Sequence, residues 1–143
     1  MTEAILIAGL PGSGKTYLGK KLSSETGYLF IDDASKAFGA SRAEALSALQ
    51  KLKGISGVII ADPLLCYEGS IENAKELLKE ALDVERVRLI CFKNEPGACL
   101  ENVKRRDDGR AVSQLIAQLS LTWKPESFKD CELRSVYSGS RKD

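Results

Sequence analysis

The 143-residue sequence contains no histidine, which excludes a Ser–His–Asp triad or a Cys–His catalytic pair. Its cysteines form no C-x-x-C pair, and together with the missing histidine this argues against a zinc site. We expect reduced and mostly buried thiols in a cytoplasmic protein, because a cysteine behaves as a small apolar residue in a core. The cysteines are Cys66, Cys91, Cys99 and Cys131.

A strong net charge and long apolar runs are also missing. The formal net charge is +1, so any binding of nucleic acid would depend on a local patch and not on a global field. The N-terminal Met-Thr-Glu has no basic stretch, and the apolar run after it, residues 4–8, is short. We therefore expect no signal peptide and no membrane partner. The length suits a single domain over residues 1–143.

The most specific motif is a phosphate-binding loop. Residues 9–16 match the pattern G-x-x-x-x-G-K-[ST], with an apolar strand before it and a helix after it; the alternative is an ordinary glycine-rich turn. Glycines let the backbone wrap a polyphosphate, and successive N–H groups point at its oxygens. Lys15 would reach the β- and γ-phosphates, and the Thr16 hydroxyl would ligate Mg²⁺. The motif predicts a nucleoside triphosphate site at Gly9, Pro11, Gly12, Ser13, Gly14, Lys15 and Thr16.

Strand and helix patterns alternate along the chain. We predict strands at residues 4–8, which are continuously apolar, and at residues 28–31, 57–61, 86–92 and about 131–137. Apolar residues at helical spacing predict helices at residues 15–26, 41–53, 70–82, 96–106 and 112–122, with Gly27 ending the first, Ser41 capping the second and Ser70 capping the third. The alternation predicts a three-layer α/β fold with a five-stranded, mostly parallel sheet and helices on both faces. Its ligand site would lie at the carboxyl ends of the strands.

Asp62 directly follows the predicted strand 57–61. A carboxylate in this place beside a phosphate-binding loop can hold Mg²⁺ directly or through water. The alternative is that Asp62 caps the turn that begins at Pro63. ATP-hydrolysing machines commonly place a glutamate after this aspartate to orient water, and this chain has Pro63 there. The usual device for activating water is therefore missing.

Asp32 and Asp33 end the predicted strand 28–31, beside the phosphate-binding loop. A carboxylate there can accept a proton from a substrate hydroxyl as a general base. We favour Asp32 as the base, because Asp33 suits the N-cap of the next helix; a solvated turn is the alternative for both. A phosphate acceptor is already ionised and needs no base, so the pair favours an alcohol acceptor over a nucleoside monophosphate.

The only dense basic cluster lies at about residues 104–112, where Gly109 supplies a hinge. Arginines that close over a triphosphate neutralise developing charge and exclude water, as the lid of a small kinase does. Arg106 and Arg110 are the candidates, with Arg105 close behind Arg106; a solvated charge run is the alternative. Elsewhere, Lys36 and Arg42 are candidates for a substrate phosphate or are surface residues. Trp123 is a core aromatic or a platform for a base.

Taken together, these motifs resemble the small P-loop kinases, and in particular the 5′-hydroxyl kinase domain of phage polynucleotide kinase. The resemblance rests on residues 9–16, the pair Asp32-Asp33, residues 57–62 and residues 103–112, in one register to about Pro125. It implies that the loop binds the ATP phosphates and that Asp32 is the base toward an acceptor hydroxyl. It also implies that lid arginines at Arg106 and Arg110 contact the donor phosphates.

The resemblance implies an ATP- and Mg²⁺-dependent kinase with a nucleic acid or nucleotide as its alcohol acceptor. Two acceptors fit equally, the 5′-hydroxyl of a polynucleotide and a hydroxymethylated pyrimidine in DNA, which relatives in phages phosphorylate. The stretch for acceptor-binding helices, about residues 33–54, is short, and Ile31 stands where the resembled kinase has a basic residue. A nucleoside monophosphate or small-metabolite kinase is the alternative, followed by a non-catalytic nucleotide-binding regulator. The sequence leaves the oligomeric state open.

Overall fold

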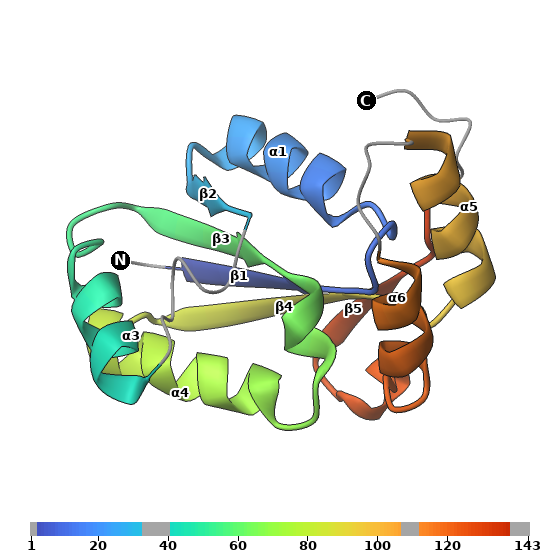
Figure 1. Cartoon of the computed structure of the whole chain (residues 1–143). Helices are drawn as coiled ribbons and strands as arrows, with labels where there is room; N and C mark the ends of the chain where they lie inside the picture. The colour runs from blue at the N-terminus through green and yellow to red at the C-terminus, as the bar shows by residue number, and fades with distance from the viewer. Residues whose placement is uncertain (1–2, 33–40, 107–111, 138–143) are drawn as a thin grey trace.

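The computed structural model describes residues 3–32, 41–106 and 112–137, and within them it contains a five-stranded parallel sheet (Figure 1). The strand order is β2-β3-β1-β4-β5, and all four neighbouring pairs are parallel. The strands are β1 (Glu3–Ala8), β2 (Leu29–Ile31), β3 (Gly57–Ala61), β4 (Arg86–Phe92) and β5 (Cys131–Arg134). The predicted α/β fold is thus confirmed, and β1, β2 and β3 end at one edge.

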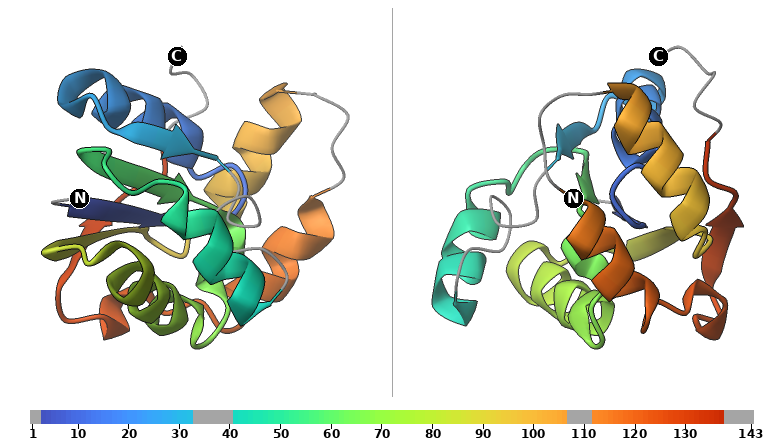
Figure 2. Two further views of the ribbon diagram at one scale, coloured as in Figure 1. Left: turned by 90° about the vertical axis from the view of Figure 1, so that its left-hand side faces the viewer. Right: turned by 45° about the vertical axis from the view of Figure 1, so that its right-hand side comes forward.

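Helices cover both faces of the sheet, as the alternation predicts (Figures 1 and 2). They are α1 (Lys15–Thr26), α3 (Arg42–Gln50), α4 (Ser70–Leu82), α5 (Pro96–Arg106) and α6 (Ser113–Ser120). Two short 3₁₀ turns, η1 (Pro63–Cys66) and η2 (Pro125–Ser127), were not predicted from the sequence. Helix α1 lies on one face, and α3, α4 and α6 lie on the other.

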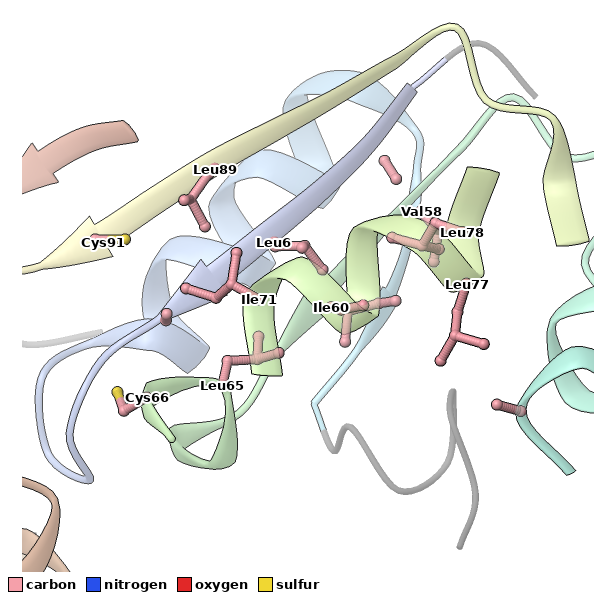
Figure 3. Close-up of a cluster of buried hydrophobic side chains, with 14 of the residues drawn as sticks. Leu6, Val58, Ile60, Leu65, Cys66, Ile71, Leu77, Leu78, Leu89 and Cys91 are labelled. Carbon is pink, nitrogen blue, oxygen red and sulfur yellow. The ribbon is translucent and has the colours of Figure 1, made fainter. Parts of the chain in front are cut away.

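The two faces of the sheet bury separate apolar clusters. Ile5 and Ile7 of β1 point toward α1, whereas Leu6 points toward α4, as the two-residue period of a strand requires. Figure 3 shows the α4 side, where Ile71 and Leu78 of that helix pack on β1 and β3. All five residues are at most 1% exposed, and burying each such side chain contributes about 1.5–3 kcal/mol. The core therefore fixes β1 and β3, the two strands that lead into the site.

Helix ends follow the predicted signals only in part, since α3 ends at Gln50 and not at residue 53, and α6 ends at Ser120 and not at residue 122. Gly27 ends α1 in the left-handed conformation (φ 78°), and the Ser41 hydroxyl accepts the Glu44 N–H at 3.2 Å at the start of α3. The prediction that Ser70 caps α4 is wrong. Gly69 holds the N-cap position with φ 80°, and Ser70 is the first helical residue. Only a glycine adopts this conformation easily, so the chain turns from η1 into α4 one residue earlier than predicted.

The cysteines are free thiols, as predicted, and three of the four are buried. Trp123 is also a core residue, since it is 3% exposed and its Nε1 donates to the Phe92 carbonyl at 3.0 Å. It is therefore not an exposed platform for a base. In the part of the chain that the structure describes, no helix is both long and apolar enough to cross a membrane.

Candidate active site

The phosphate-binding motif forms a compact loop between β1 and α1. The Ser13 N–H donates to the Leu10 carbonyl at 3.1 Å, and the backbone has positive φ at Gly12 (85°) and Gly14 (110°). Alternating left-handed residues turn successive N–H groups toward one side and form a concave nest for an anion. The first turn of α1 follows at once and adds the positive end of a helix dipole.

Residues that are far away in sequence pack closely against the loop. A Cβ atom at Gly12 would lie 2.5 Å from the carbonyl oxygen of Cys99 on α5. At Gly14 it would lie 2.1 Å from the ring of Tyr137, which follows β5. Both positions therefore need glycine for two reasons, the left-handed backbone and the close approach of a neighbour.

Lys15 is a buried lysine, 7% exposed, that folds back over the loop. Its Nζ donates to the Leu10 carbonyl at 2.9 Å and to the Ser13 hydroxyl at 3.4 Å. Burial lowers the pKa of Lys15 from 10.5 to about 8, and nearby acidic groups, among them Asp62 and Asp32, offset only part of this effect. An anion bound beside the ammonium would compensate for the hydration that burial removes and would raise this pKa again.

Asp32 lies beside the loop, as the topology predicts. The Thr16 hydroxyl donates to its Oδ2 at 2.9 Å, across a separation of sixteen residues in sequence. The candidate metal ligand and the candidate base are therefore in direct contact, and Asp32 is exposed to solvent on its other side. A carboxylate in this place reaches both the phosphate site and the solvent from which an acceptor would arrive.

Asp62 closes β3 and is 8% exposed. Its Oδ1 accepts the Leu64 N–H at 2.7 Å, so it caps η1, which is the alternative that the sequence left open for it. Asp62 also lies near enough to Lys15 to raise the pKa of that lysine. Capping leaves its magnesium role a prediction, because a carboxylate oxygen can accept more than one partner.

The oxygen groups at this edge fit a magnesium ion. A hydroxyl at Thr16 and carboxylates at Asp32 and Asp62 are hard donors, which Mg²⁺ prefers over nitrogen or sulfur. Among the described residues, no group of three or more His, Cys, Asp or Glu could hold a metal ion by itself. Magnesium usually keeps several waters and takes ligands from substrate phosphates, so its role here stays a prediction.

The predicted lid is described only in part. Arg105 and Arg106 are exposed at the end of α5, which stands with α6 at the end of the sheet that holds the phosphate loop (Figure 2). Arg110 lies outside the described residues, and so do Asp33 and Lys36. Their predicted roles remain predictions.

Two residues near the site were not predicted from the sequence. Asn102 of α5 donates to the Gly12 carbonyl at 2.8 Å, and the Tyr137 N–H donates to the Ser13 carbonyl at 3.3 Å. No local sequence pattern marks either residue.

Arg42, a candidate for a substrate phosphate, forms an ion pair with Glu80 of α4. The side chains of Arg42 and Glu80 are both exposed, which is consistent with the alternative that Arg42 is a surface residue.

Two thiols lie behind Lys15. Burial raises the pKa of Cys66 to about 12 and that of Cys99 to about 11, so both are neutral at physiological pH. Both thiols lie close enough to Lys15 to interact with its ammonium group. Catalysis by a thiolate is therefore not built into this site.

The sequence is similar to that of a viral protein. No protein-family model matches the sequence. The chain is 29% identical over 139 residues to an uncharacterized protein, R277, of Acanthamoeba polyphaga mimivirus, covering 94% of this chain and 97% of that protein.

Solved structures are similar over nearly the whole chain. A gluconokinase from Sinorhizobium meliloti superposes with a TM-score of 0.67 at 17% identity, over 95% of this chain and 83% of the other. The fold is that of the P-loop kinases. Kti12 of Chaetomium thermophilum, solved with ADP-AlF₃, gives a TM-score of 0.61 at 19% identity, over 92% of this chain and 88% of the other. These neighbours support the P-loop kinase part of the resemblance and do not bear on its polynucleotide kinase part.

Proposed function

We propose that this protein is an ATP-dependent kinase that transfers the γ-phosphate to a hydroxyl group of a nucleic acid or nucleotide. The contact of 2.9 Å between the Thr16 hydroxyl and the Asp32 carboxylate carries the proposal, since it puts a potential base beside the phosphate loop. The P-loop kinase fold and the absence of a glutamate after Asp62 support it. The nucleotide complex of the Kti12 neighbour supports a nucleotide donor.

The residues divide the work of phosphoryl transfer among them. The loop amides and Lys15 bind the β- and γ-phosphates, and Asp32 accepts the proton of the attacking hydroxyl. The new bond joins the acceptor oxygen to the γ-phosphorus, while the bond from that phosphorus to the β,γ-bridging oxygen breaks and its electron pair leaves with ADP. When bound, Mg²⁺ neutralises charge on the phosphates. Arg106 and Arg110 serve as the lid that adds positive charge and excludes water.

A second candidate acceptor is a small alcohol such as a sugar acid. The TM-score of 0.67 to a gluconokinase favours it, as does the short acceptor segment between β2 and α3. Both candidates share one reaction, in which an uncharged hydroxyl must be deprotonated. They differ only in what surrounds that hydroxyl.

Incubation with γ-labelled ATP, Mg²⁺ and a panel of acceptors tests the proposal. The panel holds oligonucleotides with a 5′-hydroxyl, DNA with hydroxymethylpyrimidines, nucleosides, nucleoside monophosphates, and sugars with their acids. We expect label on a nucleic acid or nucleotide hydroxyl. Label on a sugar or its acid alone would support the second candidate, and label on the phosphate of a monophosphate would contradict the hydroxyl assignment.

ATP binding should depend on pH through Lys15. The pKa of about 8 in the free protein means that the ammonium loses its proton above pH 8, whereas bound phosphate stabilises the protonated form. The Kd for ATP should therefore rise about tenfold between about pH 7 and pH 9, and binding near pH 8.5 should take up a proton. Titration calorimetry in buffers of different ionisation enthalpy measures both.

The same shift has the opposite effect on the stability of the free protein. Between about pH 8 and pH 10.5 the unfolded chain binds the Lys15 proton and the folded protein does not, so stability rises with pH there. A Lys15→Met variant should lose this rise and the proton uptake. An ATP affinity that is as pH-dependent in that variant as in the wild type would contradict the assignment.

A further inference from the structure

The three residues after β5 leave the sheet and cross to the phosphate loop. The prediction of a strand over residues 131–137 is wrong beyond Arg134, because the backbone N–H groups of Val136 and Tyr137 bond partners outside the sheet. The Val136 N–H donates to Glu95 Oε1 at 3.1 Å, and the Tyr137 N–H donates to the Ser13 carbonyl at 3.3 Å. The Tyr137 bond therefore holds the chain against the loop, and the Val136 bond holds it to the residue just before α5.

Asn102 joins three parts of the structure at this point. Its side-chain nitrogen donates to the Gly12 carbonyl at 2.8 Å and to the Tyr137 carbonyl at 2.7 Å. An amide nitrogen carries two hydrogens, so these two bonds use its full donor capacity. The residue is half-buried, and each carbonyl it serves would lose a partner if the amide were removed.

The Tyr137 ring completes the contact. It lies against Gly14, and it meets Tyr17 edge-on at 5.0 Å and Phe92 at 5.8 Å between ring centroids. Tyr17 belongs to the first turn of α1 and Phe92 ends β4. The ring therefore wedges between the loop, its helix and the neighbouring strand.

We propose that Asn102 is a positioning residue of the phosphate loop and that Val136–Tyr137, which it secures, is a buttress of the loop. This inference rests on the proposed function, because the loop shape matters for the N–H groups that would bind the donor phosphates. Those groups bind an anion only when the peptide planes around Gly12 and Gly14 are turned correctly. Asn102 fixes the peptide plane between Gly12 and Ser13 by its bond to the Gly12 carbonyl. The Tyr137 N–H fixes the next peptide plane by its bond to the Ser13 carbonyl.

A matched pair of asparagines tests the proposal. The Asn94 side-chain nitrogen also donates to two carbonyls, those of Ser120 at 2.8 Å and Trp123 at 3.0 Å, but outside the loop. Asn94→Ala and Asn102→Ala both delete a two-carbonyl bridge. We expect only Asn102→Ala to raise the Kd for Mg²⁺-ATP, by about tenfold or more, since small displacements of phosphate-binding groups have large effects.

Amide hydrogen exchange of peptides that cover residues 9–16 gives a second readout without nucleotide. Exchange there should be faster in Asn102→Ala and unchanged in Asn94→Ala. Equal Kd values for the two variants, with equal exchange of the loop, would overturn the proposal. If the wild type bound no ATP, the proposed function would be rejected. Hydrogen exchange of residues 9–16 would still test whether Asn102 and Val136–Tyr137 hold the loop in place. If Asn102→Ala did not fold, Asn102→Ser, which keeps one donor, would be measured by the same two criteria.

Discussion

Replacing Lys15 by methionine is expected to reduce kcat/KM for phosphoryl transfer by about a thousandfold or more, which corresponds to about 4 kcal/mol of transition-state stabilisation. Lys15 supplies the only buried ammonium among the described residues, and it would face the phosphates from within the loop. Methionine has a similar length and fills the same volume without charge. Steady-state kinetics with the acceptor identified from the panel measures the loss.

The same substitution should not destabilise the fold. Among the described residues no carboxylate forms an ion pair with Lys15, so burial opposes its charge and lowers its pKa to about 8. An apolar replacement of a buried charge is often neutral or stabilising, so we expect the free energy of unfolding at pH 7 to be unchanged or higher by about 1–3 kcal/mol. Urea unfolding measures it. Lys20→Met, at an exposed site on α1, is the control that should alter neither quantity. A fall in stability together with the loss of activity would mean that Lys15 has a structural role.

Asp32→Asn should lower kcat by about 10²–10⁴-fold, the usual contribution of a general base. Asparagine keeps an oxygen that can accept the Thr16 hydroxyl, so the contact now at 2.9 Å survives while the ability to take a proton is lost. The Kd for ATP should change little. Comparison of kcat with ATP affinity in one variant separates the chemical step from binding.

Two outcomes would reject Asp32 as the base. Recovery of activity at raised Mg²⁺ concentration would assign the carboxylate to the metal. Unchanged transfer to a nucleoside monophosphate would show that the acceptor needs no base. Asp130→Asn, at an exposed carboxylate just before β5, is the matched control and should retain full activity.

The features that local pattern could predict are those that a short stretch of chain decides by itself. The apolar runs at residues 4–8 and 57–61 predict the central strands, because only the centre of a parallel sheet buries both faces. The helical spacing of residues 70–82 predicts α4 with its bounds. Parallel order then brings Asp32 and Asp62 to the edge that holds Lys15, without any knowledge of contacts.

What could not be predicted depends on partners that are far apart in sequence. Asn102 reaches Gly12 across 90 residues and Tyr137 across 35, and an asparagine inside a helix looks like any surface residue. The end of β5 depends on the same partners, because Tyr137 leaves the sheet only where the loop and α5 offer it other bonds. Asp62 fits both a cap and a metal ligand in sequence, and only the 2.7 Å bond to the Leu64 N–H identifies the cap.

The most direct test of a hydroxyl kinase is the balance of products in a single reaction. ADP, inorganic phosphate and the phosphate ester of the acceptor are measured together, by chromatography and phosphorus NMR, with wild type and Asp32→Asn. We expect one ester for each ADP, little inorganic phosphate, and loss of the ester in the variant. ADP matched by inorganic phosphate, with no ester from any acceptor, would contradict the claim and indicate a nucleotide hydrolase.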